Sequence, residues 1–330
     1  MTIEQYKRQA SLIVGDSSGD ALDLSDLRFS FAIRRGDRQT PNSADIRVYN
    51  VSEETSNRVM QLAPTPEFTR VVIQAGYDGN CGVIFDGQII QVRRGRESQA
   101  DTYLDIMAAD GDRAYNHSLT SLSLAAGQTA PGDQLSVLLK DMAIHGVEAG
   151  HIPRIQGNPL PRGKVIYGAT RDALRVLAED NDCTWSIQDG KVNFVPLTAY
   201  IPGEVPEINS DTGMVGLPEQ AQNGIKIKTL LNPSLKIGQA IRLNNSSIQR
   251  YRFNLARNQQ VANANTELLN KINTDGLYYV MQADHSGDTR GNNWYTDIIC
   301  LAIDATITSN SNATANFPMG AEYLGSIPRY

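Results

Sequence analysis

The sequence predicts a β-rich α+β protein in which two similar β-domains flank a small inserted α+β module. Short runs that alternate apolar and polar residues occur in both halves of the chain, which is typical of half-buried strands. The order strand, strand, short helix, strand, strand occurs near residues 27–92 and again near residues 224–303. The two copies share no obvious identity. Because this order is common, coincidence is the alternative to a duplicated unit.

The first predicted β-domain covers residues 1–115 and contains one short helix. Ser52 is suited to cap this helix, and Glu53 and Glu54 follow in the first turn, where the helix dipole favours carboxylates. Asp78-Gly79 is a hairpin signal between two strands. The strands of this domain are expected at residues 8–14, 27–34, 44–49, 69–77, 83–92 and 102–108.

The pattern changes in the predicted module, residues 116–204. Apolar residues between Leu135 and Met142 lie at helical spacing, and Thr170 is expected to cap a second helix. The Asp189-Gly190 pair between two apolar strands predicts a β-hairpin. Two helices and a hairpin therefore make up the core of an α+β module.

The second predicted β-domain covers residues 205–305, and residues 306–330 are expected to form a C-terminal arm. A helix is predicted over residues 261–272. The stretch Gly276–Ala305 predicts a hairpin, because two runs rich in β-branched and aromatic residues flank a polar, glycine-containing segment. Its loop is expected at His285–Gly291, with His285 bonding to the loop backbone.

The overall charge of the chain argues against a nucleic-acid-binding footprint. The 330 residues carry a formal charge of -6, with a pI near 5.3, and 41% of them are hydrophobic, as expected of a folded chain. Two local basic clusters stand beside predicted turns and are interpreted as solvated loops or protein contacts: Arg34, Arg35 and Arg38, and Arg93, Arg94 and Arg96.

Cysteine usage and the N-terminus indicate synthesis in a reducing cytoplasm. Cys81, Cys183 and Cys300 are far apart, and their spacing matches no zinc motif, so they are expected to be buried or neutral thiols. The first residues lack the apolar core of a signal peptide, and no apolar run approaches the ~20 residues of a membrane span.

Potential catalytic motifs are better explained as structural features. Residues 15–20, GDSSGD, lack the spacing of a nucleophile elbow and suit a hairpin connection. His145 and His151 straddle a loop instead of sharing a helix face, and Asp110-Gly111-Asp112 is typical of a turn. The sequence therefore predicts no catalytic, cofactor-binding or metal-binding residue, and no enzyme.

Three segments resemble the baseplate hub proteins of tailed bacteriophages, especially those of contractile-tailed (myophage-type) phages. The first is residues 27–59, in which a strand ending in YNVS runs into a short helix. The second is NGIKIKTLLNPSLKIGQAIRL, residues 223–243, and the third is HSGDTRGNNWYT, residues 285–296. With the intervening module, the resemblance spans about residues 8–305.

This resemblance implies two tube-like β-barrel domains per chain and a structural function in the virion. Such hubs are homotrimers, so three chains form a ring of six similar domains that joins a sixfold tail tube to a threefold central spike. The expected partners are the tail tube protein, the central spike protein, the tape-measure protein and other baseplate proteins, the last through the inserted module. DNA is expected to pass through the lumen without sequence-specific binding. An acidic or neutral lining suits that passage, because it does not retain phosphate.

Three alternatives differ from the hub in ways that can be measured. A distal tail or tube-terminator protein of the same tail would form a six-subunit ring. A tail-associated cell-wall hydrolase would degrade peptidoglycan. A carbohydrate-binding receptor module would need exposed aromatic rings, whereas Trp185 and Trp294, the only tryptophans, lie in predicted strands where core packing is expected.

Overall fold

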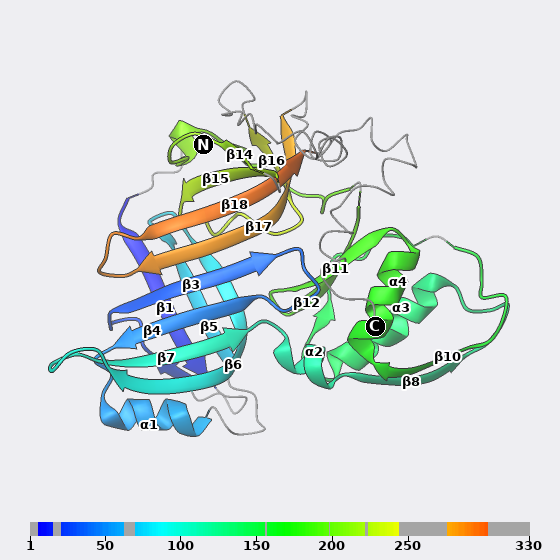
Figure 1. The fold of residues 1–330 in the computed structure, drawn as a ribbon, viewed down its shortest axis with the longest axis horizontal. Coiled ribbons are helices and arrows are strands. Elements are labelled where there is room, and N and C mark those ends of the chain that lie inside the picture. Colours follow the sequence, from blue (N-terminus) through cyan, green and yellow to red (C-terminus); the bar gives the residue numbers. More distant parts are fainter. Residues whose placement is uncertain are drawn as a thin grey trace, which may run out of the picture.

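The computed structural model describes residues 6–15, 21–62, 70–155, 157–197, 199–221, 224–243 and 276–302. The predicted helix 261–272 and the predicted C-terminal arm 306–330 lie outside the described residues. None of the helices in these ranges is long and apolar enough to cross a membrane. The described part is β-rich with few helices, as predicted, and Figure 1 shows a large sheet with a smaller α+β region at its side.

One large sheet contains strands from both ends of the chain (Figure 1). Its strands are β1 (Arg8–Gly15), β2 (Ala21–Asp23), β3 (Phe29–Gly36), β4 (Ser43–Tyr49), β5 (Arg70–Tyr77), β6 (Asn80–Arg96), β7 (Thr102–Ala109), β13 (Glu207–Ile208), β14 (Glu219–Ala221), β15 (Gly224–Leu230), β16 (Ala240–Leu243), β17 (Leu277–Asp288) and β18 (Trp294–Ala302). They follow the path β14-β15-β18-β17-β3-β4-β7-β6-β5-β1-β2, with β16 also paired to β17 and β13 paired to β16. Among the described strands this path has open ends at β14 and β2, so closed barrels remain a prediction.

The predicted short helix is present as α1 (Glu53–Leu62). The N–H of Thr55 donates to the Ser52 hydroxyl at 3.1 Å, which confirms the predicted cap. Val59 on the inner side of the helix is fully buried in the first core. Strand residues at alternate positions fill the rest of that core, including Phe29, Ile46 and Leu104.

The inserted region has its own small sheets and its own core. Its elements are α2 (Asp112–His117), β8 (Leu119–Leu124), α3 (Pro131–Ala143), β9 (Glu148–Ala149), β10 (Lys164–Ala169), α4 (Thr170–Asp180), β11 (Cys183–Gln188) and β12 (Lys191–Pro196). Helices α3 and α4 pack their apolar faces on the β11–β12 hairpin, where Trp185 pairs with Phe194 across the strands. Asp189 and Gly190 join those strands with positive φ angles of 52° and 73°, as the predicted two-residue turn requires.

The cap predicted for the second helix is wrong. Thr170 is the first residue of α4 and Ala169 precedes it, with no side-chain cap. The Thr170 side chain is fully buried, and its hydroxyl shares a 3.0 Å hydrogen bond with the hydroxyl of Thr120. The hydroxyl therefore joins α4 to β8 instead of closing the end of the helix.

The hairpin predicted at Gly276–Ala305 is present, but its loop is shorter than expected. Strand β17 continues to Asp288, and β18 begins at Trp294. Residues 282–288 remain extended because they pair with β18 on one side and with β3 on the other. His285 consequently lies inside a strand and not in the loop.

The strand order of one half of the sheet is repeated in the other half. We call β3 to β7 the first β-unit, ordered β3-β4-β7-β6-β5, and β14 to β18 the second β-unit, ordered β14-β15-β18-β17-β16. Each of these neighbouring pairs is antiparallel in both units. A duplicated strand order is therefore present, but it differs from the predicted one. The second copy begins at β14, before residue 224, so that β14 and not β15 is the counterpart of β3, and the predicted helix of the second copy lies outside the described residues.

Candidate functional site: a continuous sheet and the polar junction beside it

The two β-units are joined by backbone pairing between β3 and β17. Residues 30–36 of β3 lie antiparallel to residues 282–288 of β17, with Arg34 opposite Asp284 and Ala32 opposite Ser286. Trp294 of β18 packs edge-on against Phe31 of β3 with ring centroids 5.4 Å apart, which extends the first core to the second unit. The two units therefore form one continuous surface.

One side of this continuous sheet is apolar and the other side is polar. Strand alternation turns Phe31, Ile46 and Ile106 toward the core and their neighbours away from it. We call the outward side the polar face. The registers place on it Lys226, Lys228, Tyr295, Asp297, Asp284, Ser286, Asp288, Ser30, Ala32, Arg34, Asp45, Arg47, Asp105, Met107, Gln91 and Arg93.

Opposite charges lie beside each other at several places on the polar face, although Asp284 and Asp297 are directly opposed. Arg47 makes a two-pronged contact with Asp105, at 2.7 and 3.0 Å, and Arg34 lies 3.4 Å from Asp45. The Arg47 guanidinium also lies 4.1 Å from the ring centre of Tyr103. The face thus presents many charged groups, but each basic group named here already has an acidic partner.

An open depression lies on the polar face where strands of the two units meet. Its volume is about 550 Å³. The side chains around it include Arg47, Asp105, Met107 and Asp288. The Asp288 carboxylate pairs with Arg28 at 2.8 Å, and this contact lowers the pKa of Asp288. The depression therefore combines paired charges with Met107 and with Arg93, which donates to the Gln91 side chain at 3.0 Å.

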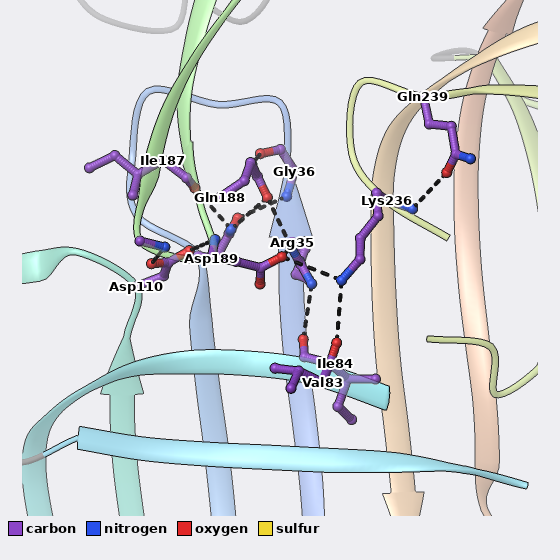
Figure 2. Close-up of polar contacts among 12 residues, drawn as sticks. Arg35, Gly36, Val83, Ile84, Asp110, Ile187, Gln188, Asp189, Lys236 and Gln239 are labelled. Atoms are coloured by element: carbon purple, nitrogen blue, oxygen red, sulfur yellow. Dashed lines mark hydrogen bonds and ion pairs between the residues drawn. The ribbon is translucent and has the colours of Figure 1, made fainter. Parts of the chain in front are cut away.

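A buried polar junction connects the inserted region to both β-units (Figure 2). The tip of the β11–β12 hairpin brings Asp189 to Arg35 of β3, at 2.9 Å, and to Lys236 of the second unit, at 3.4 Å. Arg35 and Lys236 also donate to the backbone carbonyls of Ile84 and Val83 in β6, at 3.1 and 3.3 Å. One carboxylate therefore ties three parts of the chain together.

The sequence interpretation of Arg35 as a solvated loop residue is wrong. Arg35 is 3% exposed and lies in β3, next to the hairpin tip of the inserted region. Burial alone would raise the pKa of Asp189, but the charges of Arg35 and Lys236 outweigh it and hold that pKa below its ordinary value. Burial lowers the pKa of Lys236.

The same junction contains a second buried carboxyl group, on Asp110. Its two oxygens accept hydrogen bonds from the backbone N–H groups of Asp189 and Gly190, at 2.6 and 2.8 Å. Burial raises the pKa of Asp110 to about 6, despite these bonds. Asp110 was expected in a simple turn, and the contact with a hairpin tip about 80 residues later carries no local sequence signal.

Neutral amides complete the junction. Asn42 donates to the Gln188 side chain at 2.8 Å, Gln188 donates to the Gly36 carbonyl at 2.9 Å, and the Gly36 N–H donates to Asn42 at 3.1 Å. Each of the two amide side chains is buried. A closed set of hydrogen bonds in a buried place fixes one relative orientation of β3 and the hairpin.

His285 is a packing residue of the continuous sheet. Its ring is 1% exposed and shares a 2.9 Å hydrogen bond with the Thr296 hydroxyl. Burial, together with the positive charges of Arg35 and Lys236, lowers the pKa of His285 to about 3. The bond to loop backbone expected from sequence is replaced by this contact across two strands. Within the described ranges, no three His, Cys, Asp or Glu side chains gather as a metal site would need.

The tryptophans and cysteines mostly lie where the sequence predicts. Trp185 and Trp294 are each 1% exposed, so neither ring offers a face to a sugar. Cys183 and Cys300 are buried, whereas Cys81 is exposed. Burial raises the pKa of all three thiols, to about 11 for Cys183, so the neutral form is favoured.

The fold is similar to solved structures of tail proteins, although no protein-family model and no curated protein matches the chain. A tail protein from Neisseria meningitidis MC58 superposes with a TM-score of 0.56 at 12% identity, over 90% of this chain and 97% of that one. The 43 kDa tail protein of prophage MuSo2 from Shewanella oneidensis gives 0.54 at 6% identity, over 89% and 97%.

A chain of the Francisella PdpA–VgrG complex gives a TM-score of 0.51 at 7% identity, over 91% of this chain and 58% of that one. The predicted resemblance to phage tail proteins is therefore confirmed at the level of the fold. Identities this low transfer no residue's role to this chain.

Proposed function

We propose that this chain is the structural baseplate hub of a phage tail, a homotrimer that joins a sixfold tail tube to a threefold central spike. The observation that carries the proposal is the strand order shared by two β-units in one continuous sheet. Three copies of such a chain present six similar units, so the upper side of the ring can match a sixfold partner. Cyclic symmetry then needs two complementary edges on each chain.

The proposal assigns the polar face of the sheet to the DNA channel, as a surface without bond chemistry. Two of its arginines are engaged by carboxylates, in the pairs Arg47–Asp105 and Arg34–Asp45, and Arg93 donates to the Gln91 side chain at 3.0 Å. A phosphate backbone would have to compete with these carboxylates, and the chain as a whole has a charge of -6. Such a lining lets DNA and the tape-measure protein pass without being retained.

The proposed domain organisation follows the sequence prediction. Residues 1–115 and 205–305 are assigned to the two tube-like β-barrel domains, and residues 116–204 to the inserted module. The separate hydrophobic core of the inserted region supports this division, because a domain is expected to have its own core. The central spike protein is proposed as one partner, and the similarity to a chain of the PdpA–VgrG complex supports a role in a multiprotein assembly.

The inserted module is proposed to contact other baseplate proteins through one face of the β8–β10 sheet. Leu119, Val165 and Tyr167 lie on the same face of that sheet and are 72%, 72% and 87% exposed. Adjacent exposed apolar side chains of this size are typical of a protein contact. The variant Tyr167→Asp is expected to form the trimer but to block baseplate assembly, whereas loss of the trimer itself would contradict this assignment.

The number of copies in the particle tests the proposed function. Native mass spectrometry of the purified chain, alone and with the spike protein, is expected to show three copies. Six copies would instead support a distal tail or tube-terminator protein. A monomer under both conditions would contradict both the trimeric ring and the six-subunit ring. A zone of clearing on a peptidoglycan gel would support the remaining candidate, a tail-associated cell-wall hydrolase.

A further inference from the structure

The registers of the two β-units can be matched residue by residue. Strands β6 and β7 shift register between Ile89 and Gln91, and β17 and β18 shift in the same way between Val280 and Gln282. Ile90 therefore corresponds to Met281. From that point the opposite strands also match: Tyr103, Asp105 and Ile106 of β7 take the positions of Tyr295, Asp297 and Ile298 of β18.

The strands packed against them match as well. Arg47 of β4 lies opposite Asp105, and Lys228 of β15 lies opposite Asp297. The Lys228 ammonium is 4.3 Å from the ring centre of Tyr295, much as Arg47 lies against Tyr103. The two units thus share a basic residue, a tyrosine and an aspartate at equivalent positions, which favours duplication over coincidence.

One pairing of the second unit has no counterpart in the first. β17 pairs with β18 on one side and with β3 of the first unit on the other. The matching part of β6, residues 91–96, pairs with β7 on one side, and among the described strands no strand pairs with its other side. β14, the counterpart of β3, pairs with β15 on one side, and in the part of the chain that the structure describes no strand pairs with its other side.

We propose that these two open edges pair with each other between copies of the chain, so that β6 of one copy lies antiparallel to β14 of the next. This inference rests on the proposed ring of chains, and it names the strands that close the ring. If β6 and β14 pair in the same register as β17 and β3, Arg93 lies opposite Ala221 and Gly95 lies opposite Glu219. The β3–β17 contact within a chain would then alternate with an equivalent contact between chains.

The exposure of apolar side chains supports this pairing. Met281 is 3% exposed, because it packs with Val195, Tyr279 and Leu301, whereas Ile90 at the equivalent position is 54% exposed. Val215 and Leu217, which precede β14, are 39% and 52% exposed. Apolar residues on open strand edges are a hazard unless another strand covers them. A neighbouring copy would cover them on both edges.

The charges of the two edges are complementary. The β6 edge carries Arg93, Arg94 and Arg96, and β14 begins with Glu219. Arg94 already pairs with Glu53 of α1 at 3.2 Å, on the side of the strand that faces α1. Arg93 lies on the polar face and, in the register taken from β17 and β3, is diagonal to Glu219 of the next copy. The opposite charges of these two side chains would stabilise the contact between copies.

Disulfide trapping tests the register directly. The test pair is Arg93→Cys with Ala221→Cys, in a Cys81→Ser background that removes the exposed native thiol. Directly opposed residues of an antiparallel pair have Cα atoms close enough for a disulfide. Arg34→Cys with Asp284→Cys, opposed within one chain, is the matched positive control. Arg94→Cys with Ala221→Cys is the negative control, because a one-residue shift points Arg94 to the other face.

The expected result is a covalent trimer from the test pair on a non-reducing gel, with at least ~10-fold more cross-linking than from the shifted pair. If the native protein is a trimer and the positive-control pair forms its disulfide but the test pair does not, this contact is wrong and the proposed trimer still stands. A covalent hexamer would support the contact and contradict the trimer. Absence of both cross-linking and oligomer would contradict both proposals.

Discussion

The two β-units share a strand order and differ in what covers their bulged strands. β17 lies between β18 and β3, and Met281 at its bulge is 3% exposed. In the first unit, Ile90 at the matching bulge of β6 is 54% exposed. Both residues are large and apolar, so the difference comes from their neighbours. Met281 packs with Val195 of the inserted region and with Leu301, and the next residues of β17 pair with β3. Beside Ile90, residues 91–96 of β6 pair with β7 alone among the described strands.

The largest expected effect comes from charging the two bulge positions. Met281→Asp places a carboxylate in a buried apolar cluster, and we expect it to lower the free energy of unfolding by roughly 3–5 kcal/mol. Ile90→Asp should leave the unfolding of a single chain nearly unchanged but weaken the oligomer. Urea denaturation and native mass spectrometry measure the two effects.

Met107→Asp is the control for these variants, because Met107 is 38% exposed on the polar face of the same sheet. Because Asp45 lies directly opposite, Met107→Asp should lower the free energy of unfolding by up to ~1 kcal/mol, far less than Met281→Asp, and leave the oligomer intact. If Ile90→Asp lowers single-chain stability as much as Met281→Asp does, or leaves the oligomer intact, the comparison of the two bulges is wrong.

Removing the carboxylate shared by both units should have a somewhat smaller effect. Asp189→Asn leaves Arg35, 3% exposed, without its charged partner, and we expect a loss of about 3 kcal/mol. Asp45→Asn breaks the exposed pair with Arg34 and should cost under ~1 kcal/mol. Equal losses in urea denaturation would show that the buried junction contributes no more than a surface ion pair.

The pH dependence of stability distinguishes the carboxyl of Asp110 from the ring of His285. Burial raises the pKa of Asp110 from 3.8 to about 6, so its contribution is fully present below pH 3.8 and is lost as pH rises through 6. That difference in pKa corresponds to roughly 3 kcal/mol at most. His285 has the opposite sign, because its pKa falls from 6.5 to about 3, and its contribution is lost as pH falls through that range.

Asp110→Asn isolates the first of these two contributions. The stability of the variant relative to the wild type should increase between pH 4 and pH 6, because the variant has no carboxyl to ionise. Urea midpoints at several pH values measure this difference. A difference that does not change with pH would mean that Asp110 titrates normally in the folded chain.

The smallest expected change in stability comes from replacing either of two equivalent aspartates on the polar face. Asp105→Asn breaks the two-pronged contact with Arg47 and should lower stability by about 0.5–1 kcal/mol, less at high salt. Asp297→Asn, opposite Lys228, should cost less, because a lysine does not form a planar two-pronged contact. Urea denaturation at low and high salt measures both losses of stability. A larger loss for Asp297→Asn than for Asp105→Asn would contradict the proposed equivalence of the two aspartates.

Local signals in the sequence predicted local structure well. Ser52 caps α1, and Asp189-Gly190 forms its hairpin turn, because both depend on residues within a few positions. Thr170 is an exception: its hydroxyl is recruited by Thr120 of another element. Tertiary contact decided the role of that side chain, and the sequence around it carries no sign of the contact.

The candidate site could not be predicted, because it is made of pairings between distant segments. Strand β3 meets β17 more than 200 residues later, and no local pattern specifies that register. Arg35 and His285 consequently appeared as loop residues in the sequence, although both are buried. The match of Tyr103 and Asp105 with Tyr295 and Asp297 likewise becomes visible only when strand registers are aligned.

The most direct test of the central claim is a cryo-electron microscopy map of the assembled particle. Our account predicts a ring with a central channel and six similar β-units contributed by three chains, in which the β3–β17 contact alternates with a β6–β14 contact between chains. A ring of six chains, or a trimer whose chains meet through other strands, would contradict it.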